Sequence, residues 1–176
     1  MIETQPKRYD SVARSLHWAS AIFILAAFIT GLTVDTPPKE WRPPYQNAHF
    51  LIGLTVLALA ILRLGWRAGH AVPPPPAGSS ALAALAIKLG HGALYLMMLA
   101  VPLIGFAPLF TRGRGINFGL FQIASPIDRT KEWIGPTTEV HEVAAYALIA
   151  LAVGAVAAAI YHQVALKDGV LLRMMR

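Results

Sequence analysis

Five of the six histidines in this chain lie near the ends of long apolar segments. They are His17, His49, His91, His141 and His162. The last two flank a run of twenty residues that carries no charge except Glu142. Ionisable side chains are costly inside a bilayer and mark candidate functional sites there, and neutral imidazole is a common metal ligand. The pattern predicts a metal or a metal-bearing cofactor between apolar helices, although any one of these histidines alone indicates an interfacial anchor.

The composition is typical of a membrane protein. The chain has 176 residues, of which 56% are hydrophobic and 14% charged, whereas a soluble domain usually carries about a quarter charged residues. Its mean hydropathy is +0.53. A membrane-spanning helix needs about 20 mainly apolar residues. Four segments meet this need, at about 14–34, 47–66, 82–110 and 140–166. We therefore expect an all-α, integral membrane four-helix bundle that forms a single domain over residues 1–176.

Several classes of function are excluded by composition. The chain contains no cysteine, which excludes iron–sulfur clusters, zinc–thiolate sites and covalent attachment of c-type haem. Its net charge is +6, but no basic run is interleaved with aromatic residues, so we expect no nucleic-acid partner. The expected partner is the lipid bilayer, where basic residues set topology.

The distribution of charge predicts which side holds the termini. Four spans place both termini on the same side, together with the connection between the second and third spans. That side carries nine of the fifteen basic residues and three of the nine acidic ones. The positive-inside rule then places both termini in the cytoplasm. His17, His91 and His162 fall at the cytoplasmic level, and His49 and His141 at the outer level.

The neighbours of the outer histidines favour haem. Zinc in this setting would more often recruit carboxylates or cysteines as well, and these are missing from the helix interiors. Haem iron accepts one or two histidines. Gly53 lies one helical turn after His49 and leaves room for a flat ring. Small residues follow His141 along one helix face, although small-residue packing between membrane helices gives the same pattern.

Seven runs, in order and spacing, resemble the bacterial cytochrome b561 family over nearly the whole chain. They are Arg14-Ser15-Leu16-His17-Trp18, Ala48-His49-Phe50-Leu51-Ile52-Gly53, Leu62-Arg63-Leu64-Gly65-Trp66-Arg67, His91-Gly92-Ala93-Leu94-Tyr95, Val101-Pro102-Leu103-Ile104-Gly105, His141-Glu142, and His162 followed by Lys167-Asp168-Gly169-Val170-Leu171-Leu172-Arg173-Met174. The family consists of four-helix membrane cytochromes. The resemblance implies a multi-pass protein of the bacterial inner (cytoplasmic) membrane.

The resemblance also implies two b haems stacked across the membrane. The outer haem would take His49 and His141. The inner haem would take His17 and a histidine fourteen residues after His141, a position that holds Ala155 here. Three outcomes follow: the inner haem is absent, it is held by His17 alone or with water, or it recruits a substitute ligand. We favour a retained inner haem with a substitute, and His91 and His162 are the candidates.

Some members of the family resemble superoxide oxidases. The resemblance therefore implies electron transfer from an outer-side one-electron donor, superoxide or a redox protein, to ubiquinone, and so a superoxide:ubiquinone oxidoreductase. Arg112 and Arg114 would steer the anion to the outer haem, although arginines of a solvated loop or partners of haem propionates fit the same pattern. Arg14 is a candidate contact of quinone or propionate, and His91 and His162 are candidates for a quinone site. The alternative is a haem-bearing anchor that relays electrons within a larger respiratory complex.

Overall fold

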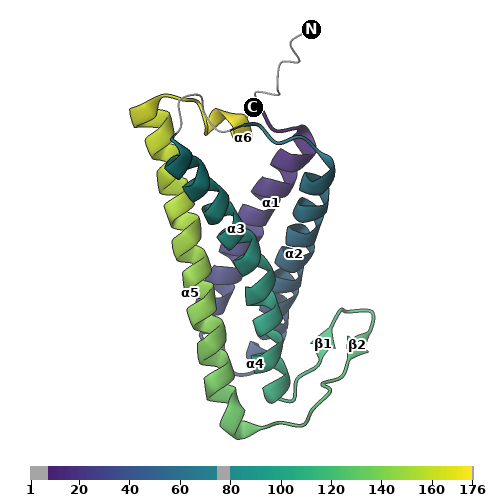
Figure 1. Cartoon of the computed structure of the whole chain (residues 1–176). Coiled ribbons are helices and arrows are strands. Elements are labelled where there is room, and N and C mark those ends of the chain that lie inside the picture. The colour runs from purple at the N-terminus through teal and green to yellow at the C-terminus, as the bar shows by residue number, and fades with distance from the viewer. Residues whose placement is uncertain (1–7, 75–79, 176) are drawn as a thin grey trace.

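Four long helices form the molecule in a computed structural model that describes residues 8–74 and 80–175. They are α1 (Ser11–Leu32), α2 (Arg42–Gly69), α3 (Ala81–Ile104) and α5 (Lys131–Tyr161) (Figure 1). The short helix α4 (Phe106–Thr111) continues α3 beyond Gly105, and a π-helical turn (His162–Leu166) continues α5. All four are long and apolar enough to cross a membrane. The predicted fold class, an all-α membrane four-helix bundle, is confirmed.

Local sequence explains where these helices begin. The side chain of Asp10 accepts a hydrogen bond from the backbone N–H of Ala13 and so caps α1, and Ser80 caps α3 through the N–H of Ala83. Both side chains satisfy a donor that the first helical turn leaves unpaired. Two prolines open α2, where the missing N–H costs nothing. Pro43 and Pro44 therefore lie at the start of α2, where proline is compatible with a helix.

The helices pack as neighbours in chain order. α1 lies along α2, α2 along α3, and α3 and α4 along α5 (Figure 1). The rings of Phe28 in α1 and Tyr146 in α5 also meet edge-on, with centres 5.8 Å apart. The start of α1 and the short helix α6 (Leu172–Met175) lie at the same end of the bundle (Figure 1). We call this the inner end, following the predicted cytoplasmic location of the termini.

A small buried core lies halfway along the bundle. It consists of Ala60, Met98, Val101 and Leu148. Leu148 lies two turns from His141 on α5, and Val101 one turn from Gly105 on α3. Many larger apolar side chains face outward, among them Ile22 and Leu25, and the hydrocarbon of a bilayer would cover them. The core therefore separates an outer half of the bundle from an inner half.

The outer connection is more ordered than its polar sequence suggests. Strands β1 (Ile116–Asn117) and β2 (Gln122–Ile123) pair antiparallel as a short hairpin. Asn47 at the start of α2 donates to the backbone oxygen of Asn117 at 2.8 Å and accepts from its N–H at 3.0 Å. After the hairpin, α5 begins already at Lys131, ahead of the expected start of the span near residue 140.

The inner end is covered by the C-terminal segment, residues 167–175. Lys167 adopts the left-handed conformation after the π-helical turn, and the chain then runs back toward α1. The indole N–H of Trp18 donates to the backbone oxygen of Met174 at 3.0 Å. Asp168 pairs with His162 at the end of α5. The segment thus connects the ends of α5 and α1.

Candidate functional site

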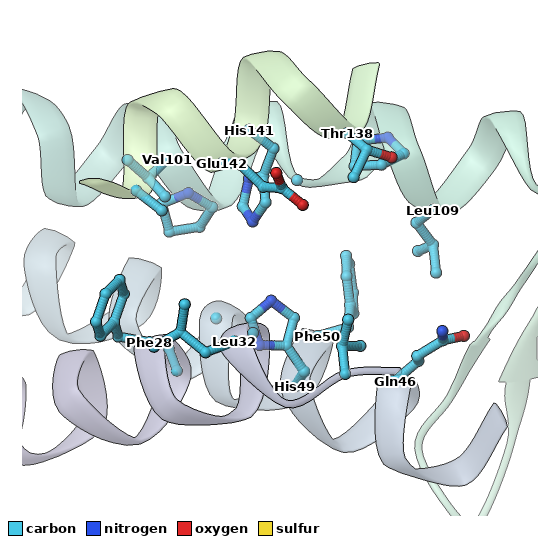
Figure 2. A pocket seen from close by; sticks show the side chains of 18 of the residues that line it. Phe28, Leu32, Gln46, His49, Phe50, Val101, Leu109, Thr138, His141 and Glu142 are labelled. Atoms are coloured by element: carbon cyan, nitrogen blue, oxygen red, sulfur yellow. The ribbon is translucent and has the colours of Figure 1, made fainter. Parts of the chain in front are cut away.

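A cavity of about 380 Å³ occupies the outer half of the bundle. Residues of α1, α2, α3, α4 and α5 line it, and its walls are mainly apolar. Figure 2 shows that His49 and His141 project into it from opposite walls. Thr138 and Gln46 lie toward one end, and Phe28 and Val101 toward the other. An apolar cavity with a few convergent polar groups is the usual form of a cofactor site.

The two imidazoles face each other at a distance that suits a shared metal ion. Their ring centres lie 6.1 Å apart and their planes are inclined by 83°. A metal–imidazole bond is about 2 Å long, so two rings that bind one metal from opposite sides have centres roughly 6 Å apart. The pair predicted from the sequence is therefore brought together with the spacing that two axial haem ligands require.

A threonine sets the orientation of His49. The hydroxyl of Thr30 has one hydrogen, which it directs to the backbone oxygens of Ala26 at 2.8 Å and Ala27 at 3.1 Å. It therefore accepts a hydrogen bond from Nδ1–H of His49, at 3.0 Å. This places the proton on Nδ1 and leaves the lone pair of Nε2 for a ligand. His49 is thus held in the tautomer of a metal ligand.

Two glycines leave the space that the imidazole rings occupy. A Cβ added at Gly31 would lie 3.1 Å from Cε1 of His49, and one added at Gly105 would lie 3.1 Å from Cε1 of His141. Each ring therefore packs directly on the backbone of a neighbouring helix. Gly53 also lines the cavity, and a Cβ there would meet nothing within 4 Å. The space that the sequence predicted beside His49 is present.

His141 differs from His49 in its hydrogen bonding. Its Nδ1 is buried and has no hydrogen-bond partner among the described residues. Buried polar groups are normally paired. Nδ1 of His141 packs toward the backbone near Gly105, where an added Cβ would lie 3.4 Å from it, so Nε2 is the nitrogen available to a metal. The donor set and the unpaired nitrogen both fit a haem held between His49 and His141.

Charged side chains surround the outer mouth of the cavity. Arg112 donates to the backbone oxygen of Pro108 at 2.8 Å and to the hydroxyl of Thr138 at 3.0 Å. Arg114, Asp35 and Glu142 also line the cavity. Within residues 8–74 and 80–175, neither arginine forms an ion pair with a carboxylate. The mouth therefore presents two guanidinium groups whose charges are not neutralised by direct contact.

The histidines of the inner half are dispersed. The ring of His17 packs edge-on against Trp18, and its Nδ1 lies 3.3 Å from a guanidinium nitrogen of Arg63. His91 is exposed, and its Nδ1 bonds the backbone oxygen of Ile87 in its own helix at 2.8 Å. His162 is paired with Asp168. The structure does not bring these histidines together as a facing pair.

Two further positions bear on the inner half. Arg14 lies one turn before His17 in α1, and its assignment to quinone or propionate stays a prediction. Ala155, at the position where a second iron ligand is expected, is exposed on α5. The remaining histidine, His70, is exposed and stacks on Trp66 with ring centres 3.7 Å apart.

Sequence reasoning missed the supporting residues of the outer pair. Thr30 and Gly31 lie near the end of the first span, and nothing in their local pattern distinguishes them from ordinary small residues of a membrane helix. Their role depends on which face of α1 meets His49. Gly105 could have been found as a glycine after a proline in an apolar run, where a change in helix direction is expected.

Comparison with known proteins agrees with this geometry. Residues 8–176 match the family described as prokaryotic cytochrome b561. A cytochrome b562 of Cereibacter sphaeroides is 32% identical over 98% of this chain and 98% of its own. The probable superoxide oxidase CybB of Yersinia pestis is 30% identical over 96% of each chain. Cytochrome b561 homolog 2 of Escherichia coli is 28% identical over 97% of this chain and 92% of its own.

Proposed function

We propose that this chain, which belongs to the prokaryotic cytochrome b561 family, transfers electrons to quinone. The electrons would come from a one-electron donor on the outer side of the membrane. The family and the four apolar helices make it a multi-pass bacterial membrane protein and a b-type cytochrome. Its location in the inner membrane, with both termini in the cytoplasm, belongs to the proposal.

One observation carries the proposal. His49 and His141 face each other across an apolar cavity, with ring centres 6.1 Å apart. When bound there, haem b would supply reversible one-electron oxidation and reduction. The protein's own part is to hold both imidazoles in place, through Thr30 for His49 and through packing on Gly105 for His141.

Superoxide is the donor that the outer mouth suits best. Arg112 and Arg114 lie at the entrance of the cavity beside the carboxylates of Asp35 and Glu142. Among the described residues, the two guanidinium groups form no ion pair with these carboxylates and so would attract a small anion. Two superoxide ions would each lose one electron and leave as dioxygen. The two electrons, with two protons, would reduce ubiquinone to ubiquinol. The relative named as a probable superoxide oxidase supports this superoxide:ubiquinone oxidoreductase activity. Arg14, His91 and His162 remain candidates for contacts to the quinone.

A relay subunit of a larger respiratory complex is the second candidate. The observation that favours it is the outer hairpin, where Phe118 and Phe121 stack with ring centres 4.8 Å apart. Leu120 at its tip is 98% exposed. An apolar hairpin beside the mouth is a suitable contact for a partner protein that would deliver electrons without superoxide chemistry.

Superoxide-driven reduction of ubiquinone by the purified, haem-loaded protein tests the proposal. We expect a haem spectrum that His49→Ala and His141→Ala each abolish. We expect Arg112→Gln and Arg114→Gln to slow the reaction at low ionic strength and to weaken its dependence on salt, because screening acts on the steering charge. Lys39→Gln, a change of charge on the same side outside the cavity lining, is the matched control. Haem without any superoxide-driven activity would favour the relay, and absence of haem would contradict both functions.

A further inference from the structure

We propose that this chain binds a single haem, at the outer histidine pair, and that its inner half is not a haem site. The inference rests on the assignment of haem to His49 and His141 made above. Its basis is a pair of residues in the inner half: Ala155, which supplies no ligand, and Arg63, which holds His17 in a tautomer unsuited to binding iron.

Ala155 lies where the second inner ligand would have to be. Fourteen residues of α-helix rise about 21 Å and return to nearly the same face, so a residue fourteen positions after His141 would face a second haem stacked below the first. The methyl group of Ala155 has no donor atom. An inner haem would therefore lack the opposing histidine that His49 and His141 give each other.

His17 itself is arranged differently from His49. Its Nδ1 lies 3.3 Å from Nη2 of Arg63. A guanidinium group has only donors, so Nδ1 of His17 must accept this hydrogen bond. In neutral imidazole one nitrogen accepts and the other carries the proton. The proton of His17 is therefore on Nε2, and neither nitrogen has a free lone pair to offer to iron.

The contrast with the outer site is one of hydrogen-bond direction. Metal-binding histidines usually donate their second N–H to a carbonyl, carboxylate or other acceptor. His49 does so to Thr30. For His17 to bind iron through Nε2, its proton would have to move to Nδ1, where it would point at the N–H groups of Arg63. Two donors, Nδ1–H of His17 and an N–H of Arg63, would then face each other without an acceptor between them. Unpaired polar groups are costly in an apolar environment.

Arg63 is fixed in this position by neighbours from α3. Its guanidinium carbon lies 5.1 Å from the centre of the Tyr95 ring, and Nη1 lies 3.8 Å from Sδ of Met98. No carboxylate among the described residues forms an ion pair with it. A haem propionate could neutralise Arg63, but the pairing would still leave Ala155 opposite an iron at His17.

The candidate substitutes do not complete an inner pair. His91 is exposed on α3 and donates its Nδ1–H to the backbone oxygen of Ile87, which leaves Nε2 open to a ligand, but its ring does not meet that of His17 in the aromatic contacts of the described residues. His162 is bonded through Nδ1 to Asp168, but it lies in the π-helical turn seven residues beyond Ala155, where its ring meets that of Tyr161. In the aromatic contacts of the described residues, the ring of His17 meets only that of Trp18, with centres 5.5 Å apart. No second imidazole faces His17 as His141 faces His49.

The decisive experiment counts haem. Full-length protein is purified in detergent, and haem is quantified by pyridine haemochrome against protein determined by amino-acid analysis. We expect one haem per chain and a single one-electron wave in a potentiometric titration followed by absorbance. Two haems per chain, or two waves, would overturn this inference and leave the proposed function standing. No haem would overturn both.

Variants separate the two levels of the bundle. His17→Gln keeps an oxygen that can accept from Arg63 and so protects the fold, and we expect its haem content and midpoint potential to match the wild type. A loss of haem or of a redox wave in His17→Gln would contradict the single-site assignment. Ala155→His restores the missing ligand, and we expect the count to stay at one because Arg63 still holds His17. A rise to two would overturn the role given to Arg63.

Discussion

At the scale of single residues, the function of a histidine in this protein depends on its hydrogen-bond partner. His49 of α2 is hydrogen-bonded to a side chain of α1, and His17 of α1 is hydrogen-bonded to a side chain of α2. Thr30 accepts a hydrogen bond from His49, whereas Arg63 donates one to His17. The same residue type therefore presents a lone pair at the outer level and none at the inner level.

Thr30 should therefore matter for haem affinity without touching haem. Thr30→Val preserves the shape of the side chain but removes the acceptor of Nδ1–H. Loss of such a supporting hydrogen bond typically weakens metal binding by about 10–100-fold. We expect this loss in haem titrations of the depleted protein. Thr30→Ser keeps the hydroxyl and should bind as the wild type does, and so should Thr33→Val, whose hydroxyl bonds Tyr45 instead. Equal affinity of Thr30→Val and the wild type would contradict this role.

The histidines of the outer pair could be predicted from the sequence because both lie near the outer ends of their apolar segments. Two ionisable groups at matching depths in apolar helices require a shared reason. Thr30, Gly31 and Arg63 could not be assigned in this way. Their roles depend on helix rotation and on distances across the bundle, which hydropathy does not specify.

At the scale of secondary-structure elements, hydropathy located the spans but not all of their ends. α5 begins at Lys131, and its first turns carry charged and polar residues. Hydropathy marks only the apolar part of this helix, so it placed the start of the span too late. The outer hairpin was missed since its strands are two residues each. The C-terminal segment bonds to α1 through Trp18, a contact that hydropathy does not predict.

The C-terminal segment should loosen in acid. A hydrogen bond from His162 holds the pKa of Asp168 below its usual value near 3.8, with help from the backbone N–H of Val170. A carboxyl whose pKa is lowered on folding stabilises the folded form above its usual pKa, and the contribution is lost as pH falls through the folded value. The window therefore lies below about pH 4.

Tryptophan fluorescence can follow this change, because Trp18 contacts the segment at Met174. We expect the emission to change as pH falls below 4 in the wild type. Asp168→Asn should show the altered emission already at neutral pH. Asp128→Asn, which removes a carboxylate from the outer connection, is the matched control. A wild-type signal that is unchanged down to pH 2.5 would rule out the contact as a stabilising one.

At the scale of the whole molecule, α1 packs along α2 and α3 along α5, and contacts of α2 with α3 join these two helix pairs. The cavity lies between them, and α1 meets α5 through the edge-on contact of Phe28 and Tyr146. Each pair contributes one histidine of the outer site. The buried core between the pairs is small. A bound cofactor would therefore supply much of the packing that joins the two pairs.

Removing haem should accordingly lower thermal stability. A ligand at about 1,000 times its dissociation constant stabilises the folded state by roughly 4 kcal/mol, which corresponds to a rise in Tm of about 10 °C for a chain of this size. We expect a drop of this order in His141→Ala relative to the haem-loaded wild type in detergent, followed by tryptophan fluorescence. Ala155→Leu, a change on the same helix outside the cavity lining, should melt as the wild type does. Coincident melting of His141→Ala and the wild type would show that the cofactor does not join the pairs.

The placement of one ligand on each helix pair also bears on how the protein is made. During synthesis, α1 and α2 are made before α3 and α5. His49 of α2 is therefore in place before His141 of α5 has been synthesised. At the proposed site, haem could be held by both imidazoles only after the second pair has been inserted and has docked against the first. We therefore expect the two helix pairs, α1–α2 and α3–α5, to dock against each other in the bilayer at the same late step in which haem binds.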